Sequence, residues 1–214
     1  PAKTAGRKGA GPRMMPNMVI GKIGFGTTGL LALSGEGERQ RLLGAALDAG
    51  ITHFDTAPYY GYGEAEKILG RFIKGMRSRV TVTTKFGIRP PRLAGGGSVA
   101  GAVKRLVRHL APLRKLLADQ AGKMVQRGAF GAADAEESLE ASLRALQTDH
   151  IDIYLLHEAG PGDTSDELLA FLEKKTEEGV IGRFGTGSEF ARVAEIAATR
   201  PGFAGVLQFE NSAT

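Results

Sequence analysis

Segments with the residue pattern of strands alternate with segments patterned as helices along most of this chain, and a polar residue ends nearly every strand-like segment. Five polar residues hold that place: Asp55, Lys85, His157, Ser188 and Gln208. Strands that alternate with helices predict a parallel sheet, whose strands all end at the same edge. We therefore expect these five side chains to meet at the carboxyl edge of the sheet, where such folds place their active sites.

The number of strand-like segments narrows the fold class. We expect strands over residues 18–23, 52–56, 80–85, 151–157, 182–187 and 205–208, and helices over 38–49, 64–74, 134–147, 165–178 and 189–199. This succession predicts an α/β protein, a parallel (β/α)8 barrel of TIM type. A complete barrel has eight units and typically about 250 residues. The 214-residue chain is therefore expected to supply only about the first six βα units, as a single incomplete barrel domain over residues 1–214.

Two of the expected helices begin with a capping-box pattern, in which paired side chains satisfy the first backbone N–H groups. Asp134 with Glu137 predicts one helix start, and Thr164 with Glu167 predicts another. We therefore expect Asp134 and Thr164 to be the capping residues.

Residues 89–131 form an insertion after the third expected strand, and it is too long for an ordinary connection. It holds nine Lys or Arg residues against one acid, Asp119, whereas the whole chain has a net charge of +5. The rest of the chain is therefore net acidic. Residues 99–117 carry apolar side chains at helical spacing. The insertion is either a lid over the mouth of the site or an amphipathic helix that packs on the barrel, and both interpretations stay open.

Residues 24–29 read Gly-Phe-Gly-Thr-Thr-Gly, a motif typical of Rossmann dinucleotide sites when a helix begins at its last glycine. The residues that follow include Ser34, Gly35 and Gly37, and the next helical pattern begins near Glu38. No helix amino terminus is therefore presented to a pyrophosphate. The motif alone does not favour a Rossmann fold over the barrel.

Composition excludes several kinds of site. The chain has no cysteine, so disulfides and zinc-thiolate centres are excluded, and we expect a reducing, cytoplasmic location. His53 is expected to be a hydrogen-bonded core or rim residue, while His109 and His150 lack partners at metal-ligand spacing, so no metal site is expected. No apolar run approaches the roughly 20 residues that cross a bilayer. We expect neither a membrane nor a nucleic acid as partner.

The string Asp55-Thr56-Ala57-Pro58-Tyr59-Tyr60-Gly61, joined by the strand-end residues Lys85 and His157, resembles the aldo-keto reductase family. The resemblance covers about residues 20–212 apart from the basic insertion. It implies a (β/α)8 barrel that reduces aldehydes or ketones by hydride transfer from NADPH, or alternatively NADH, or that oxidises the corresponding alcohols, including sugars. The implied partner is a small carbonyl or alcohol molecule.

The resemblance implies four catalytic residues, Asp55, Tyr60, Lys85 and His157. Hydride delivery leaves negative charge on the carbonyl oxygen, which a general acid must protonate. A free phenol is a weak acid with a pKa of about 10, and a nearby ammonium stabilises its deprotonated form. Lys85 would supply that charge to Tyr60, and Asp55 would pair with Lys85. His157 would donate a hydrogen bond to the substrate oxygen.

For the cofactor, the resemblance implies contacts from Gly26, Thr27, Thr28, Asp55, Ser188 and Gln208. The first three would lie near the nicotinamide ribose, and Gln208 would bind the carboxamide. The usual Ser-Asn pair of the family is here Gly187-Ser188, so one side-chain partner of the carboxamide is lost. The family holds the adenosine phosphate around its last two strands, which are not among these 214 residues. NADP is the expected cofactor, and NAD is the alternative.

Two hypotheses follow. In the first, the chain is the larger part of a catalytically competent aldo-keto reductase. In the second, it is a truncated, non-catalytic module that binds or regulates, with its open sheet edges covered by another subunit. The sequence does not predict an oligomeric state.

Overall fold

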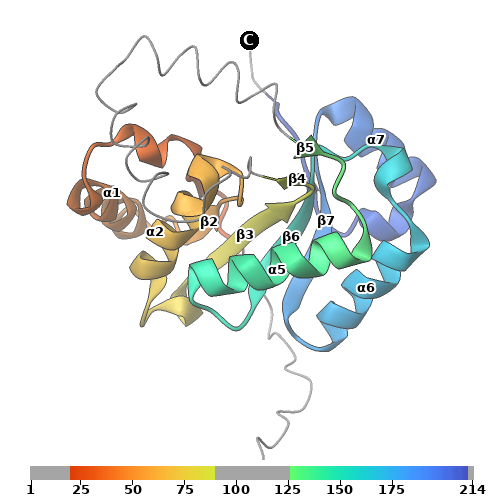
Figure 1. The fold of residues 1–214 in the computed structure, drawn as a ribbon. Coiled ribbons are helices and arrows are strands. Elements are labelled where there is room, and N and C mark those ends of the chain that lie inside the picture. Colours follow the sequence, from red (N-terminus) through yellow and green to blue (C-terminus); the bar gives the residue numbers. More distant parts are fainter. Residues whose placement is uncertain (1–19, 90–125, 212–214) are drawn as a thin grey trace, which may run out of the picture.

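A curled sheet of six parallel strands forms the centre of the protein in a computed structural model that describes residues 20–89 and 126–211 (Figure 1). The strands are β1 (Gly24–Gly26), β2 (His53–Asp55), β3 (Thr81–Phe86), β6 (Ile151–His157), β7 (Ile181–Gly187) and β8 (Leu207–Gln208). They lie in the order β1-β2-β3-β6-β7-β8, so each strand pairs in parallel with the next one along the chain. This is the strand order of a barrel, whereas a Rossmann sheet reverses its order at the centre. The predicted fold class is confirmed, as a half-barrel.

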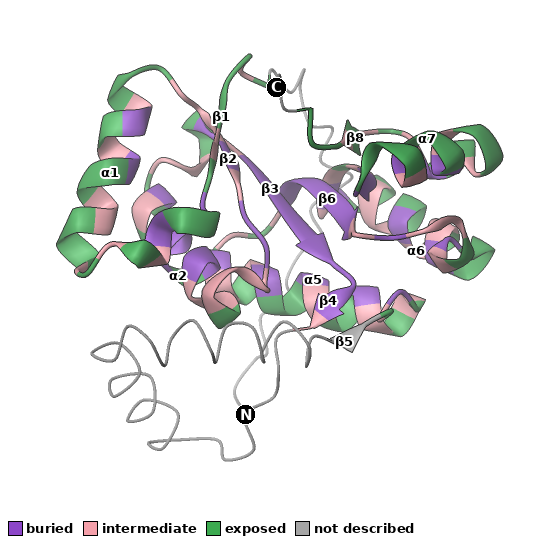
Figure 2. Cartoon of the chain, turned by 90° about the horizontal axis from the view of Figure 1, so that it is seen from above, coloured by how far each residue is buried: buried purple, intermediate pink, exposed green. Residues whose placement is uncertain are grey.

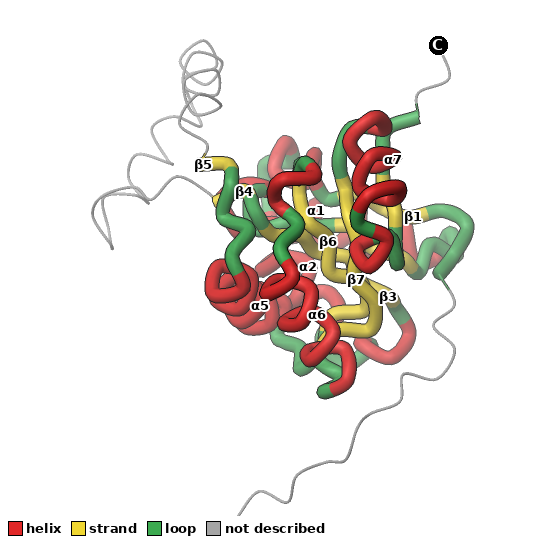
Figure 3. Tube along the Cα trace, turned by 90° about the vertical axis from the view of Figure 1, so that its right-hand side faces the viewer, coloured by secondary structure: helices red, strands yellow, loops and turns green. Residues whose placement is uncertain are grey.

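In the part of the chain that the structure describes, five helices lie in an arc around the outside of the curled sheet (Figure 2). They are α1 (Glu36–Asp48), α2 (Glu64–Ile73), α5 (Ala132–Leu146), α6 (Asp166–Glu177) and α7 (Phe190–Thr199). Single turns of 3-10 helix connect them to the strands: η1 (Thr28–Ala32), η2 (Tyr60–Gly63), η3 (Arg77–Arg79), η4 (Pro161–Asp163) and η5 (Pro201–Phe203). Figure 3 shows α2, α5 and α6 side by side on one side of the strands. The alternation of strands and helices was predicted in the correct order.

The core lies between the sheet and these helices. β3 and β6 are buried along almost their whole length, as expected for parallel strands that are covered on both faces. Phe86 of β3 stacks on Tyr154 of β6 with ring centroids 4.7 Å apart. On the helix side, Leu69 of α2 and Leu139 of α5 belong to the same buried cluster. The two central strands therefore hold the residues at their ends in a rigid setting.

The first strand was predicted too early in the chain. Residues 22–23 form a bend, and Ile23 is 67% exposed. The strand is Gly24–Gly26, because these residues pair in register with His53–Asp55 of β2. The first three residues of the glycine motif form β1, and its last two lie in η1. Helix α1 begins only at Glu36. The apolar residues Met18, Val19, Ile20 and Ile23 suggested a strand over 18–23, but the residues that pair with β2 are Gly24–Gly26.

Both predicted capping residues were wrong by a few positions. α5 begins at Ala132, and the Asp134 carboxylate accepts a hydrogen bond of 3.3 Å from the Gly131 backbone N–H. In α6 the capping residue is Ser165, whose hydroxyl accepts from the Leu168 N–H at 3.2 Å. Thr164 instead donates its hydroxyl hydrogen to the Pro161 carbonyl. Several side chains that can accept a hydrogen bond lie near the start of each helix. The path of the backbone decides which of them caps the helix.

The basic insertion begins with an antiparallel pair, β4 (Ile88–Arg89) and β5 (Gln126–Arg127), beyond the end of β3. Arg89 donates hydrogen bonds to the carboxylates of Asp134 and Glu137 on α5. The expected helix over 99–117 lies outside the described residues, so the role of 89–131 as a lid stays a prediction. Across residues 20–89 and 126–211, no helix combines the length and apolarity needed to cross a membrane.

Candidate active site

Lys85, at the carboxyl end of β3, is 3% exposed and contacts two other predicted catalytic residues. Its Nζ donates a hydrogen bond of 2.5 Å to Oδ1 of Asp55 and one of 3.3 Å to the Thr56 carbonyl. The same Nζ lies 3.4 Å from the phenolic oxygen of Tyr60. A buried ammonium is costly unless it is paired, and here the Asp55 carboxylate, whose side chain is 15% exposed, provides the opposite charge.

Tyr60 reaches Lys85 because the chain turns sharply after β2. The Tyr60 N–H donates to the Ala57 carbonyl at 3.0 Å, and the next residue, Gly61, has a φ of +59°. A Cβ atom on Gly61 would lie 1.5 Å from Cδ1 of Leu31, so only glycine fits both the backbone angle and the space. The glycine of the Tyr60-Gly61 pair thus sets the position of the tyrosine.

His157 ends β6, and its ring meets the Tyr60 ring edge to face, with centroids 5.9 Å apart and an interplanar angle of 88°. The next residue, Glu158, has the unusual φ of +60° for a non-glycine. Its N–H donates to the Gly187 carbonyl at 2.7 Å, and its carbonyl accepts from Arg192 at 3.3 Å. This turn leaves His157 facing Tyr60 from the neighbouring strand.

These residues line one pocket of about 280 Å³. Its walls include the four predicted catalytic residues and two predicted cofactor residues: Asp55, Tyr60, Lys85, His157, Ser188 and Gln208. Gln208 donates from Nε2 to Oδ2 of Asp55 at 2.8 Å. Ser188 is 7% exposed, and its Oγ has no hydrogen-bond partner among the described residues. The carboxyl ends of five strands thus converge as the sequence predicted.

The other three predicted cofactor residues are not among those that line the pocket. Gly26 pairs with Asp55 between β1 and β2. Thr27 is fully buried, and both its N–H and its hydroxyl donate to the Asp55 carbonyl, at 2.9 and 3.1 Å. Thr28 is exposed at the start of η1. Thr27 therefore holds the backbone of Asp55 in place.

Besides Gly187, three residues line the pocket that were not predicted from the sequence: Glu158, Phe209 and Glu210. Each follows a predicted strand-end residue by one or two positions. Residues just beyond strand ends enter a site through the turn that follows, and such turns have no periodic pattern. The only signal in the sequence was that these three residues follow His157 or Gln208 within two positions.

His53 lies in β2 with both ring nitrogens near hydroxyls, 2.8 Å from Thr81 and 3.3 Å from Thr83. Burial lowers its pKa from the ordinary value. The prediction of a hydrogen-bonded core or rim histidine is confirmed. Within residues 20–89 and 126–211, no three His, Asp or Glu side chains gather as metal ligands would.

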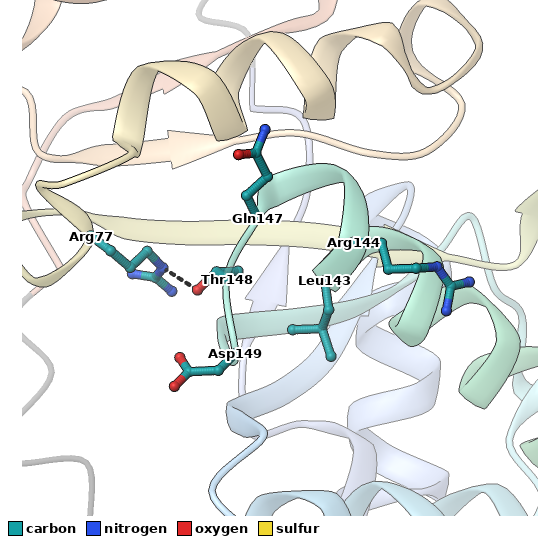
Figure 4. A pocket seen from close by; sticks show the side chains of 6 residues that line it. All are labelled: Arg77, Leu143, Arg144, Gln147, Thr148 and Asp149. Atoms are coloured by element: carbon teal, nitrogen blue, oxygen red, sulfur yellow. Dashed lines mark hydrogen bonds between the residues drawn. The ribbon is translucent and has the colours of Figure 1, made fainter.

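A larger hollow, of about 490 Å³, lies at the other end of the sheet (Figure 4). It is lined by the end of α5 and the connection into β6, together with Arg77: Arg77, Leu143, Arg144, Gln147, Thr148 and Asp149. Arg77 donates to the Thr148 hydroxyl at 3.0 Å. Residues at the amino ends of barrel strands usually serve stability. The candidate site is therefore the smaller pocket at the carboxyl ends.

Parallel strands in sequential order, with their polar end residues converging on one pocket, define an α/β barrel protein with its site at the carboxyl face. The chain belongs to the aldo/keto reductase family, whose model matches residues 18–212.

Relatives of known sequence and structure support this assignment. The chain is 31% identical over 173 residues to the aldo-keto reductase YhdN of Bacillus subtilis, covering 78% of this chain and 43% of that protein. It is 30% identical over 155 residues to the methylglyoxal reductase YeaE of Escherichia coli, covering 72% and 40%.

Solved structures agree with these sequence relatives. The aldo-keto reductase AKR11C1 of Bacillus halodurans superposes with a TM-score of 0.65 at 26% identity, covering 88% of this chain and 53% of that one. A Klebsiella pneumoniae aldo/keto reductase in complex with NADP and acetate gives a TM-score of 0.56 at 27% identity, with 84% and 50% covered. The chain spans about half the length of the proteins it matches.

Proposed function

We propose that the protein is an NAD(P)H-dependent aldo-keto reductase that reduces aldehydes and ketones, or oxidises the corresponding alcohols, with Tyr60 as general acid and base. The observation that carries the proposal is the position of the Lys85 ammonium, which contacts the Asp55 carboxylate at 2.5 Å and the Tyr60 oxygen at 3.4 Å. The names of two relatives support it, a methylglyoxal reductase and a structure that holds NADP.

Proton transfer is the task of Tyr60. A reduced nicotinamide, when bound, would supply the hydride that the carbonyl carbon receives. Tyr60 donates its phenolic proton to the carbonyl oxygen, which yields the alcohol and leaves a phenolate on Tyr60. The Lys85 ammonium stabilises that phenolate by charge, since its Nζ is within hydrogen-bond reach of the oxygen. In alcohol oxidation the phenolate takes the proton back.

Asp55 and His157 position the other groups. Asp55 gives the buried Lys85 ammonium its counter-charge and holds it beside Tyr60. His157 stands beside Tyr60 and donates a ring N–H to the same carbonyl oxygen, which orients the substrate and stabilises negative charge as it develops.

The residues at the pocket wall fit a nicotinamide. The buried Ser188 Oγ lacks a partner among the described residues, and an unpaired buried hydroxyl costs free energy that a ligand group would recover. Gln208, in the neighbouring strand β8, accepts the Ser188 backbone N–H at its carbonyl and donates from its side chain to Asp55. Ser188 and Gln208 would hold the carboxamide. NADP is the proposed cofactor, and NAD is the alternative.

The test uses the protein expressed from its complete reading frame. Consumption of NADPH is followed with small aldehydes, methylglyoxal among them, in the native protein and in Tyr60→Phe. We expect the substitution to lower turnover by about 100-fold or more, as loss of a general acid does, while calorimetry shows unchanged NADPH binding. Tyr62→Phe is the control, because Tyr62 is 46% exposed in the same loop. Equal turnover in Tyr60→Phe and native protein would refute the role of Tyr60.

The non-catalytic alternative is favoured by one observation. Apolar side chains are exposed along both edges of the sheet, with Ile23 at 67%, Leu207 at 39% and Phe209 at 40%. Natural proteins cover such edges, and another subunit is one way to do so. The same assay separates the two: a protein that binds NADPH, yet leaves every aldehyde unreduced, is a binding module.

A further inference from the structure

Glu158 is a carboxylate in the wall of the candidate site to which the proposed mechanism gives no task. It directly follows His157 and lines the same pocket. Within the part of the chain that the structure describes, its side chain makes no hydrogen bond and no ion pair. A carboxylate at a pocket wall is an acceptor and a negative charge that a ligand would meet.

The backbone of Glu158 is held on both sides. Its φ is +60°, in the left-handed region that residues other than glycine seldom adopt. Its N–H donates to the Gly187 carbonyl at 2.7 Å, and its own carbonyl accepts from Arg192 at 3.3 Å. Such a conformation persists where surrounding contacts hold it, and these positions cluster at ligand sites. The turn therefore keeps the Glu158 side chain at the pocket wall.

The side chains that line the pocket carry an excess of negative charge. They include one ammonium, Lys85, and three carboxylates, Asp55, Glu158 and Glu210. Lys85 balances Asp55, with which it pairs at 2.5 Å. The lining charges therefore sum to an excess of two carboxylates. A cleft lined by one sign of charge raises the local concentration of ligands of the opposite sign.

We propose that Glu158 determines the substrate specificity of this site: it favours carbonyl compounds that carry a cationic group a few atoms from the carbonyl and disfavours those that carry a carboxylate or a phosphate. This inference rests on the proposed function. Tyr60 and His157 would hold the carbonyl oxygen, and Glu158, the neighbour of His157, would lie beside the rest of the molecule. Attraction of the cation and repulsion of the anion both widen the difference between the two classes.

The charge of the whole chain would produce the opposite preference. The chain carries a net charge of +5, which attracts anions at long range. A preference for cations must therefore arise close to the site. The sign of the preference thus distinguishes an effect of the pocket lining from the field of the whole protein.

Three aldehydes test the preference in the protein expressed from its complete reading frame: pentanal and two analogues of similar length, one ending in a trimethylammonium group and one in a carboxylate. Native protein should reduce the cationic aldehyde with a kcat/KM about 10-fold or more above that of the anionic one, and the ratio should shrink as salt is added. In Glu158→Gln, kcat/KM relative to pentanal should fall for the cation and rise for the anion. A merely structural defect would lower all three together.

Glu189→Gln is the matched control. Glu189 also carries a carboxylate and lies directly after Ser188, but its side chain is 73% exposed and is not among those that line the pocket. The substitution changes the net charge by the same amount and should leave the ratio of cation to anion as in the native protein. Glu158→Lys should reverse the preference. An equal ratio in native protein and Glu158→Gln, or an equal fall in both glutamine variants, would overturn the proposal.

Binding without turnover separates this inference from the proposed function. NMR titration gives the Kd of each charged aldehyde for Tyr60→Phe and for Tyr60→Phe/Glu158→Gln. If the first binds the cation more tightly and the second does not, Glu158 has the proposed role, even where the native protein reduces no aldehyde and the proposed function alone fails. A native protein that reduces pentanal and shows no charge preference refutes the role of Glu158 alone. A protein that neither binds nor reduces these aldehydes refutes both.

Discussion

Lys85 lies beneath Tyr60, with Nζ 3.4 Å from the phenolic oxygen and 5.2 Å from the centre of the ring. The ammonium therefore acts on both the oxygen and the ring face. Residues 85 and 60 come from the end of β3 and from the loop after β2, and β2 and β3 are adjacent in the sheet. Adjacent parallel strands thus bring the Tyr60 phenol and the Lys85 ammonium together.

Lys85→Met should lower aldehyde turnover by about 100-fold or more, because Tyr60 loses the charge that stabilises its phenolate. It should also destabilise the fold, since Asp55 is left without its cation. The double variant Lys85→Met/Asp55→Asn should recover stability in urea unfolding and remain inactive. Recovery of turnover along with stability would show that Lys85 has only a structural role.

Gly61→Ala should reduce turnover without changing the chemistry of any catalytic side chain. The new Cβ would meet Leu31, and alanine costs about 1 kcal/mol or more in the left-handed region. The loop must move, and Tyr60 moves with it. Adding Leu31→Ala relieves the contact but not the backbone strain, so steady-state assays should show partial recovery. Full activity in Gly61→Ala would contradict this placement of Tyr60.

Glu66 should make the protein less stable as the pH rises. It is 2% exposed on α2 and accepts a hydrogen bond of 2.7 Å from Thr84, and its burial raises its pKa above the ordinary value. The folded state therefore holds the proton more tightly than the unfolded state does. Stability is greatest below the ordinary pKa of about 4.3 and declines as the pH rises through the raised folded value.

Glu66→Gln removes that ionisation. Its urea midpoint should exceed that of the native protein at pH 8 and approach it at pH 4. Glu140→Gln, an exposed position on α5, is the matched control and should follow the native protein at every pH. If Glu66→Gln and native protein show parallel pH dependence, Glu66 is ionised in the folded state.

Arg77→Leu should destabilise the fold by about 3 kcal/mol, because Asp152 is buried and would lose its cation. The pair is joined at 2.5 Å, with side chains 17% and 8% exposed, and Asp152 also accepts from the Val82 N–H. Arg144→Leu, from an exposed pair with Glu140, should cost about 0.5 kcal/mol. Turnover per folded molecule should stay native in both, because this cluster lies at the amino ends of the strands. Equal urea midpoints for the two variants would show that the Arg77 pair contributes no more than a surface one.

The sequence predicted correctly those features that are written in a short run of neighbouring residues. Lys85 and His157 stand at the ends of long apolar runs, so their place at the carboxyl edge followed from the strand pattern. It failed for β1, because the apolar residues before Gly24 resemble a strand better than Gly24–Gly26 does. It also missed Glu158, whose left-handed backbone follows from the turn after β6.

The sequence by itself determined the kinds of side chain at the strand ends and the order in which the strands follow one another, since both are written in short runs of neighbouring residues. Only the tertiary structure decided which of those side chains share a hydrogen bond. Gln208 and Asp55 are 153 positions apart, and they meet because the sheet curls and brings the ends of β2 and β8 to one pocket. Curvature arises from packing over the whole chain, and no local pattern of residues encodes it.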